Sequence, residues 1–152
     1  MKLSVTIRGS LGRKYGAANL RLMATQKTIG SHKFESAVPE RTISVLRELD
    51  ADLLCLQEVV NAPTQAPLFD QAGEIARALP EYTACFGANR PLRGGTYGSL
   101  TLSRLPMLAW KNIEITQRRE PRGVLMTDLS LGANETLHVF NVHLGTGFME
   151  RR

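Results

Sequence analysis

The chain has 152 residues, a length that predicts one domain with a sizeable buried core. Hydrophobic residues make up 43% and charged residues 22%, as in a globular protein, and no apolar run approaches the roughly 18 residues of a membrane span. The net charge is +5, and all of the basic excess lies in residues 1–34, which hold seven Lys or Arg and no acid. These totals exclude a membrane-spanning helix and a uniformly basic domain.

The basic start of the chain predicts a flexible leader over residues 1–18, outside the folded domain. Gly9, Gly12 and Gly16 are spread among its basic residues, and glycine favours irregular backbone. The segment lacks the continuous apolar stretch of about 7–15 residues that a secretory signal carries. It could attract phosphates, membranes or an import receptor, or have no function. A first strand is expected at residues 19–25, where apolar and polar residues alternate.

Residues 40–60 predict a helix, a tight turn and a short buried strand. Ile43, Leu46 and Leu49 lie three residues apart, which is the spacing of one helical face. The apolar run LLCL that follows the turn suits a strand covered on both faces. Glu58 comes shortly afterwards, so its carboxylate lies at the carboxyl end of the strand, where open α/β sheets bind ligands. The residues alone fit an ordinary solvated strand end as well.

The rest of the chain predicts a second helix followed by a series of strands. The expected elements are a helix at 69–79, strands at 82–86, 99–103 and 105–115, and a hairpin of strands at 124–131 and 136–144. A glycine- and arginine-rich loop is expected at 87–98. Two helix-strand units followed by strands predict a mixed sheet in an α/β sandwich.

The two cysteines, Cys55 and Cys85, both lie in apolar, strand-like stretches. We therefore expect buried free thiols rather than a disulfide framework or a metal site. The cysteines leave the cellular compartment open, and a cytoplasmic location is favoured.

Three stretches resemble the signatures of the endonuclease/exonuclease/phosphatase superfamily of metal-dependent, deoxyribonuclease I-like proteins. They are DADLLCLQEV at residues 50–59, GTYGSLTLSRLPM at 95–107 and EPRGVLMTDLSLGANETLHVFNVHLG at 120–145. The resemblance implies the N-terminal half of that domain over residues 19–152. The implied fold is α/β, a partial four-layer αββα sandwich with a mixed, largely antiparallel sheet.

The resemblance also implies the roles of two principal site residues. Glu58 matches the glutamate that binds the catalytic Mg²⁺ in this family, with Mn²⁺ as an alternative ion. His143 matches a catalytic histidine beside the scissile phosphate, where an imidazole can donate a proton or a hydrogen bond to developing negative charge. Asn141 lies two residues earlier, hence on the same strand face, and is expected to orient the site. A histidine that ends an apolar strand is also often purely structural.

Supporting positions of the family pattern are matched less closely. The Asn that supports the metal after the first strand corresponds to Gln26 or, with a small gap, Thr28, and the longer Gln stem weakens this metal ligand. Ser99 stands where many relatives have Asn, next to Tyr97 in the second signature; both are expected at the substrate, as is Arg122 at a substrate phosphate. Arginines of the same region also offer phosphate contacts, namely Arg90, Arg93 and Arg104.

The second half of the family pattern has no counterpart here. It carries an Asp-x-Asn pair and a late Asp-His pair, and neither a D-x-N nor an S-D-H motif occurs in the sequence. We therefore expect a truncated chain whose catalysis alone is doubtful, with strand edges and a sheet face left uncovered.

Two functions from different classes follow from these observations. The first is a Mg²⁺-dependent phosphoester hydrolase, with phosphodiesters preferred and nucleic acid, phospholipid or sugar phosphate as the substrate. The second is a non-catalytic fragment that pairs with a complementary chain, forms a homodimer or binds anionic partners. A sequence-independent nucleic-acid binder is less favoured, because aromatics are only 6% of residues and do not alternate with basic ones.

Overall fold

The computed structural model describes residues 2–3, 27–28, 40–62, 69–116 and 121–143. These residues form two helices, α1 (Glu40–Leu49) and α2 (Gln71–Ala78). Their strands are β1 (Lys2–Leu3), β2 (Lys27–Thr28), β3 (Leu53–Asn61), β4 (Thr83–Leu92), β5 (Gly95–Ser103), β6 (Met107–Thr116), β7 (Arg122–Gly132) and β8 (Glu135–Val142). Within the described residues, no helix has the length and apolar character needed to cross a membrane.

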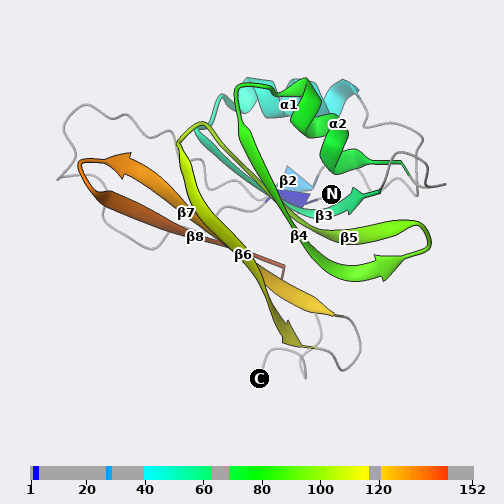
Figure 1. Cartoon of the computed structure of the whole chain (residues 1–152). Helices are drawn as coiled ribbons and strands as arrows, with labels where there is room; N and C mark the ends of the chain where they lie inside the picture. The colour runs from blue at the N-terminus through cyan, green and yellow to red at the C-terminus, as the bar shows by residue number, and fades with distance from the viewer. Residues whose placement is uncertain (1, 4–26, 29–39, 63–68, 117–120, 144–152) are drawn as a thin grey trace.

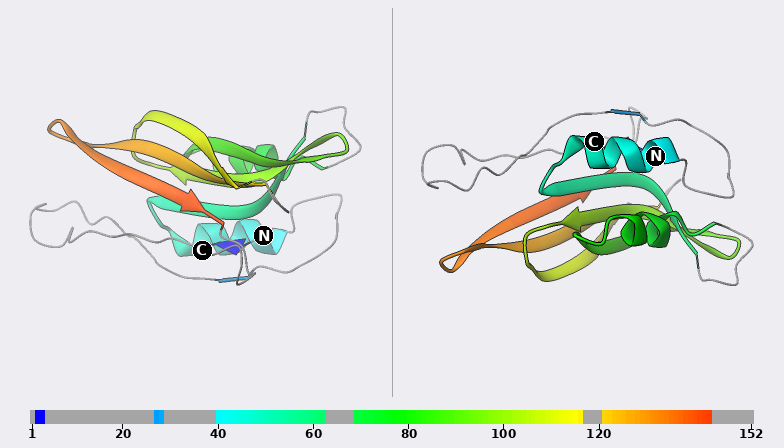
Figure 2. Two further views of the ribbon diagram at one scale, coloured as in Figure 1. Left: turned by 90° about the horizontal axis from the view of Figure 1, so that it is seen from below. Right: turned by 90° about the horizontal axis from the view of Figure 1, so that it is seen from above.

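The described strands form two antiparallel sheets that pack face to face (Figure 1). The first sheet has the order β2-β1-β3-β5-β4, and the second has the order β6-β7-β8. Helices α1 and α2 lie on the face of the first sheet that is turned away from the second sheet (Figures 1 and 2). The expected α/β sandwich with mostly antiparallel strands is therefore confirmed, with one helical layer and two sheet layers in the described part of the chain.

The helical layer is held by a core that follows the two-residue period of β3 and β5. On one face of these strands, leucine side chains point towards the helices and pack with apolar side chains of α1 and α2. The leucines are Leu54, Leu56, Leu100 and Leu102, and the helix residues are Ile43, Leu46, Ala72 and Ile75. The alternate residues of β3 face the second sheet, where Leu53 and Cys55 pack with Leu129. Strand β3 is thus buried on both faces, as its continuous apolar run predicted.

Several polar side chains are buried in the layer between the sheets. Its buried polar side chains within the described residues include Gln57, Ser99, Thr101, Thr127 and Asn141. Burying such groups is costly unless they are hydrogen-bonded. The packing of the two sheets therefore depends on specific polar contacts as well as on apolar packing.

The segment predicted as a glycine-rich loop at 87–98 is instead most of a β-hairpin. Strand β4 continues to Leu92, the turn is made by Arg93 and Gly94, and β5 begins at Gly95. A Cβ at Gly98 would collide with the backbone carbonyl of Gly87 on the neighbouring strand. Glycine at this position allows the two strands to pair closely. The loop was predicted from glycine content, which does not distinguish a loop from closely paired strands.

The hairpin predicted around residues 132–134 is confirmed. Gly132 pairs with Glu135, and the two residues between them, Ala133 and Asn134, both have positive φ. Two such residues match the type I′ turn that suits the twist of a two-residue hairpin.

The predicted leader lies mostly outside the described residues. Within its range, residues Lys2–Leu3 form β1 and pair with Leu56 and Gln57 of β3. The first strand expected at 19–25 falls wholly on residues that are not described.

One face of the β6-β7-β8 sheet points away from the rest of the described sandwich (Figure 1). Cross-strand pairing places five apolar side chains on it, which we call the outer face: Ile113, Val124, Met126, Phe140 and Val142. Ile113 is 40% exposed and Phe140 is 54% exposed. Adjacent apolar side chains of this size on a sheet surface indicate a face that another layer can cover.

Candidate metal and phosphate site

Glu58 leaves the regular course of β3 through a β-bulge. Gln57 pairs with Ser99 and Val59 pairs with Gly98, so Glu58 is an extra residue inserted between two ladder positions. Its φ is +61°, a left-handed conformation that is rare for a residue other than glycine. Bulges re-aim side chains at the rims of sheets and next to active sites. The strained backbone of Glu58 thus directs a carboxylate out of the strand.

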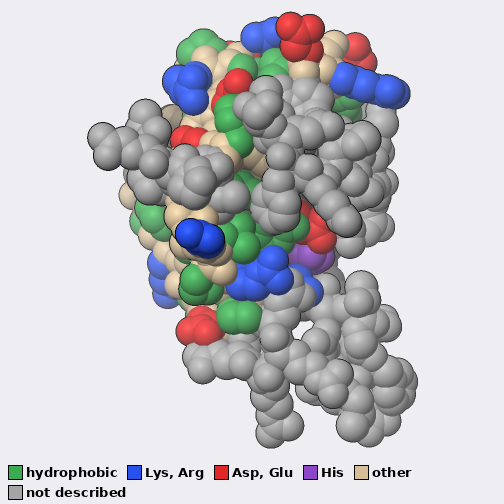
Figure 3. Space-filling view, turned by 90° about the vertical axis from the view of Figure 1, so that its right-hand side faces the viewer, with side chains coloured by type: hydrophobic (Ala, Val, Ile, Leu, Met, Phe, Trp, Pro, Cys, Tyr) green, Lys and Arg blue, Asp and Glu red, His purple; other side chains and the backbone are tan. Residues whose placement is uncertain are grey.

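The carboxylate of Glu58 meets the imidazole of His143, from the other sheet. His143 directly follows β8, and its Nε2 lies 3.6 Å from Oε1 of Glu58. Arg122, the first residue of β7, places Nη1 2.9 Å from Nδ1 of the same ring. The side chains of Glu58 and His143 are 26% and 15% exposed. On the face in Figure 3, a histidine lies between acidic and basic side chains. The structure therefore joins three residues predicted for the site.

Asn141 lies on β8, two residues before His143, and is buried between the sheets. Its Oδ1 accepts a hydrogen bond of 2.8 Å from Nε2 of Gln57. Its Nδ2 donates to the carbonyl oxygens of Leu56 and Leu100, at 3.2 and 3.1 Å. The side chain is only 2% exposed. Asn141 therefore joins β8 to β3 and β5, and the orienting role at the site stays a prediction.

Gln57 is the residue that the sequence alone did not single out. It precedes Glu58, while its partner Asn141 stands two residues before His143. The hydrogen bond between the two amides therefore ties the strand that carries the carboxylate to the strand that carries the imidazole. The place of Gln57 in the LQE motif could have marked it as a site residue. Its partner Asn141 lies too far along the sequence for any local pattern to indicate the contact.

The two predicted substrate residues of β5 differ in their exposure. Tyr97 is half-buried, pairs with Val60 and Arg90, and has the Arg90 guanidinium 5.3 Å from its ring centroid. Ser99 is 1% exposed, and its buried hydroxyl has no hydrogen-bond partner among the described residues. Within the described residues, Ser99 thus leaves a polar atom unsatisfied between the sheets.

Of the two residues predicted as metal ligands, only Glu58 lies within the described residues. They contain no group of three or more His, Cys, Asp or Glu side chains placed to hold a metal ion. Gln26, predicted as a second metal ligand, lies outside the described residues. One carboxylate fits a Mg²⁺ ion, which commonly takes one or two carboxylates, several waters and substrate phosphates. Glu58 has the oxygen chemistry that such an ion prefers.

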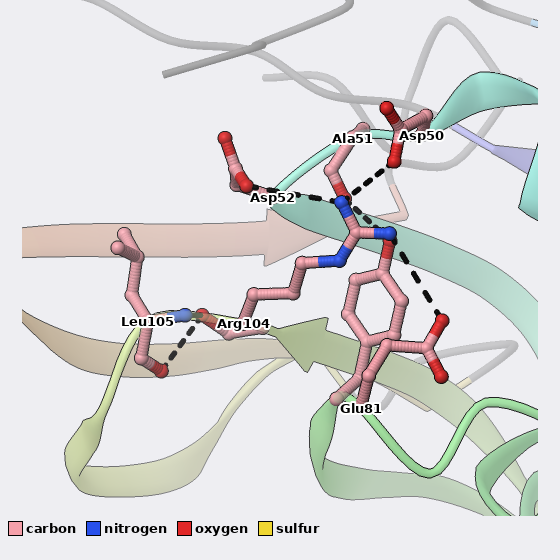
Figure 4. A network of polar contacts seen from close by, with 8 residues as sticks. Asp50, Ala51, Asp52, Glu81, Arg104 and Leu105 are labelled. Atoms are coloured by element: carbon pink, nitrogen blue, oxygen red, sulfur yellow. Dashed lines mark hydrogen bonds and ion pairs between the residues drawn. The ribbon is translucent and has the colours of Figure 1, made fainter. Parts of the chain in front are cut away.

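Arg104, expected as a phosphate contact, belongs instead to a network at the opposite end of β3 (Figure 4). Its Nη1 lies 2.8 Å from Oδ1 of Asp50, and its guanidinium stacks on Tyr82 at 4.7 Å from the ring centroid. The hydroxyl of Tyr82 donates to the carbonyl of Ala51 at 2.6 Å. Because Ser103 pairs with Leu53, this network lies about 17 Å along the strand from Glu58. Arg104 is therefore structural, and the expectation for it was wrong.

The cysteines take no part in the cluster and are buried free thiols, as predicted. Burial raises the pKa of the Cys55 thiol to about 12, and it raises the pKa of Cys85 as well. Both thiols are therefore protonated at neutral pH, and a protonated thiol is neither a nucleophile nor a metal ligand.

The geometry agrees with a comparison of the sequence with protein families. Residues 32–145 match the model of the Endonuclease/Exonuclease/phosphatase family. The chain belongs to this family. The match includes Glu58, Asn141, Arg122 and His143, and so covers the whole described cluster.

Curated relatives of this family member are longer than it is. The uncharacterized protein YbhP of Escherichia coli K12 is 30% identical over 132 residues, which cover 78% of this chain and 52% of that protein. YbhP of Shigella flexneri matches to the same extent. The chain thus spans about half the length of the curated relatives it matches.

Two solved structures share the fold of this chain. An endonuclease/exonuclease/phosphatase from Beutenbergia cavernae superposes with a TM-score of 0.62 at 20% identity, over 76% of this chain and 37% of the other. TDP2 from Caenorhabditis elegans gives a TM-score of 0.57 at 18% identity, over 74% and 31% of the two chains.

Proposed function

We propose that the chain carries half of a Mg²⁺-dependent phosphodiester hydrolase site. The observation that carries the proposal is the bulge at Glu58, which brings a carboxylate within 3.6 Å of His143 across two sheets. Family membership supports a phosphoester hydrolase, and phosphodiesters are preferred over phosphomonoesters. Nucleic acid, phospholipid and sugar phosphate remain the candidate substrates.

Each residue of the cluster has a chemical part in this proposal. Glu58 would hold the ion, which supplies polarisation of the phosphate and stabilisation of the leaving oxygen when bound. The ring of His143 would donate to a phosphate oxygen as negative charge builds on it. Arg122 would add positive charge beside the same phosphate. Asn141 and Gln57 would keep the two strands in register.

The test measures metal binding and hydrolysis separately in the purified chain. Calorimetric titration with Mg²⁺ and Mn²⁺ reports binding, and release of p-nitrophenol from bis-p-nitrophenyl phosphate reports hydrolysis, with EDTA as the metal-free control. Plasmid DNA, phospholipid vesicles and a sugar phosphate compare the substrate classes. Glu58→Gln keeps the shape of the side chain and removes its charge, and Glu135→Gln is the matched control on an exposed turn-end residue.

Any hydrolysis by this half-site should require the metal, be lost in Glu58→Gln and His143→Ala, and be kept in Glu135→Gln. Metal binding should weaken in Glu58→Gln alone. A folded chain that binds no divalent ion, or whose turnover is unchanged by Glu58→Gln, would contradict the proposal.

A second candidate function is a non-catalytic chain that pairs with a complementary chain or with a second copy. The observation that favours it is the apolar outer face, in a chain that spans about half the length of its curated relatives. Ion binding without hydrolysis in the isolated chain, together with stable self-association, would favour this function over the first.

A further inference from the structure

The contact between Arg122 and His143 determines which nitrogen of the ring carries the proton. Nη1 of Arg122 lies 2.9 Å from Nδ1 of His143, which is a hydrogen-bonding distance. A guanidinium has five N–H donors, has no acceptor and stays charged at every accessible pH. Nδ1 must therefore accept this hydrogen bond through its lone pair, and a neutral ring then carries its proton on Nε2.

The nitrogen that carries the proton is the one directed at the candidate site. Nε2 of His143 faces Oε1 of Glu58 at 3.6 Å, which is longer than a hydrogen bond. An Nε2–H group in this position can donate to a phosphate oxygen beside the carboxylate. It has no lone pair with which to accept a proton.

We propose that Arg122 is a positioning residue that holds His143 as the Nε2–H tautomer, so that His143 acts on a phosphate by donating a hydrogen bond rather than as a general base. The catalytic half of this statement rests on the proposed function. The tautomer itself is a property of the folded chain and is testable without substrate. It also gives Arg122 a part that does not depend on contact with a substrate phosphate.

The second described histidine supplies an internal comparison with the opposite chemistry. Nδ1 of His138 lies 2.7 Å from Oδ1 of Asp128, which pairs with it across β7 and β8. An ionised carboxylate is an acceptor only, so Nδ1 of His138 must carry a proton. The two histidines are therefore expected to hold their Nδ1 atoms in opposite states, because one faces a donor and the other an acceptor.

The experiment is a long-range ¹H–¹⁵N correlation spectrum of the full chain labelled at histidine. It is recorded at pH 8.5, about two units above the ordinary pKa of histidine, so that neutral rings dominate. The cross-peak pattern of each ring distinguishes its Nδ1–H and Nε2–H forms. Assignments come from His143→Ala and His138→Ala, and a short histidine peptide in the same buffer gives the ratio without protein contacts.

Two substitutions of Arg122 test whether its N–H donors determine the tautomer of His143. Arg122→Met keeps much of the length of this half-buried side chain and removes every donor, whereas Arg122→Lys keeps a charged donor. Asp128→Asn is the matched control, because it weakens the acceptor that faces His138 and leaves the Arg122 contact in place.

In the wild-type chain we expect His143 to populate the Nε2–H form about tenfold or more over the Nδ1–H form, because a hydrogen bond to a charged group favours one tautomer by that amount. Arg122→Met should return His143 to the peptide ratio, and Arg122→Lys should restore part of the preference. His138 should remain protonated on Nδ1 in both Arg122 variants and should respond to Asp128→Asn.

Nδ1–H as the main form of His143, or a His143 pattern that is the same in wild type and Arg122→Met, would overturn the proposal. The wild-type spectrum alone is decisive on the first point, even if Arg122→Met folds poorly. If the tautomer follows Arg122 but the chain binds no Mg²⁺, the proposed function fails while the positioning by Arg122 stands. If Glu58→Gln abolishes Mg²⁺ binding but the tautomer ignores Arg122, the positioning fails and the proposed function stands.

Discussion

At the scale of single residues, the amide of Asn141 determines how β8 meets the first sheet. Its oxygen accepts from Gln57, and its nitrogen donates to two backbone carbonyls, so the contact needs both halves of an amide. A carboxylate of the same shape keeps the acceptor and loses both donors. It would also place a negative charge against the carbonyl oxygens of Leu56 and Leu100.

Asn141→Asp should therefore lower the free energy of unfolding by about 2–4 kcal/mol, because it leaves buried carbonyls without their donor. Urea unfolding at pH 7, followed by circular dichroism, measures the loss. His143→Ala, two residues away on a partly exposed side chain, should cost about 1 kcal/mol or less and serves as the control. Equal stability of Asn141→Asp and wild type would mean that the amide does not join the sheets.

At the scale of elements, the Arg104 network links three connections of the fold. Asp50 follows α1, Glu81 and Tyr82 precede β4, and Arg104 follows β5, so one guanidinium ties three chain reversals together (Figure 4). Burial raises the pKa of Tyr82, an effect that the neighbouring Arg104 partly opposes. The folded state therefore binds the phenolic proton more tightly than the unfolded chain does.

The sign of this pKa shift gives a prediction for the pH dependence of stability. The contribution of Tyr82 is fully present below its ordinary pKa of about 10 and is lost as pH rises through the higher folded-state pKa. Tyr82→Phe loses the hydrogen bond to Ala51 and should be less stable by about 1 kcal/mol at pH 7. Because the variant has no phenol, its deficit should shrink from pH 9 to pH 10.5 in urea unfolding. A deficit that stays constant across this range would contradict the shift.

The elements also show how far the sequence predicts the fold. Both helices and most strands follow from periodicity. Helix α2 begins at Gln71, two residues after the expected start, because the Asp70 side chain caps it by accepting from the backbone N–H of Gly73 at 3.1 Å. The bulge at Glu58 was not predicted, because no local pattern signals a positive φ at a glutamate. The roles of Gln57 and Arg104 were missed because their partners lie 84 and 54 residues away. Patterns within a strand predict burial, but they do not predict which distant side chain completes a contact.

At the scale of the whole molecule, the apolar outer face should cause self-association. Val124 pairs with Ile113 on β6 and with Val142 on β8, so this row is apolar across all three strands. In the next row Met126 pairs with Phe140 on β8 and with Lys111 on β6. Burying a large apolar side chain contributes about 1.5–3 kcal/mol. We expect Ile113→Lys and Phe140→Lys each to weaken association about tenfold or more in sedimentation velocity experiments.

The control for this prediction is Glu135→Gln, which raises the net charge by the same +1 at the exposed turn end of β8, away from Ile113. It should leave the association unchanged. A wild-type chain that stays monomeric at every concentration tested would show that its own copies do not cover the outer face.

The contact between Gln57 and Asn141 also has a consequence for the order in which the protein folds. It joins residues that are 84 positions apart, and contacts of such separation form late because the intervening chain must first lose its conformational freedom. During synthesis, the strand that bears Glu58 leaves the ribosome well before the strand that bears His143. A nascent chain therefore has no assembled site, and ligand binding by this cluster would report that folding is complete.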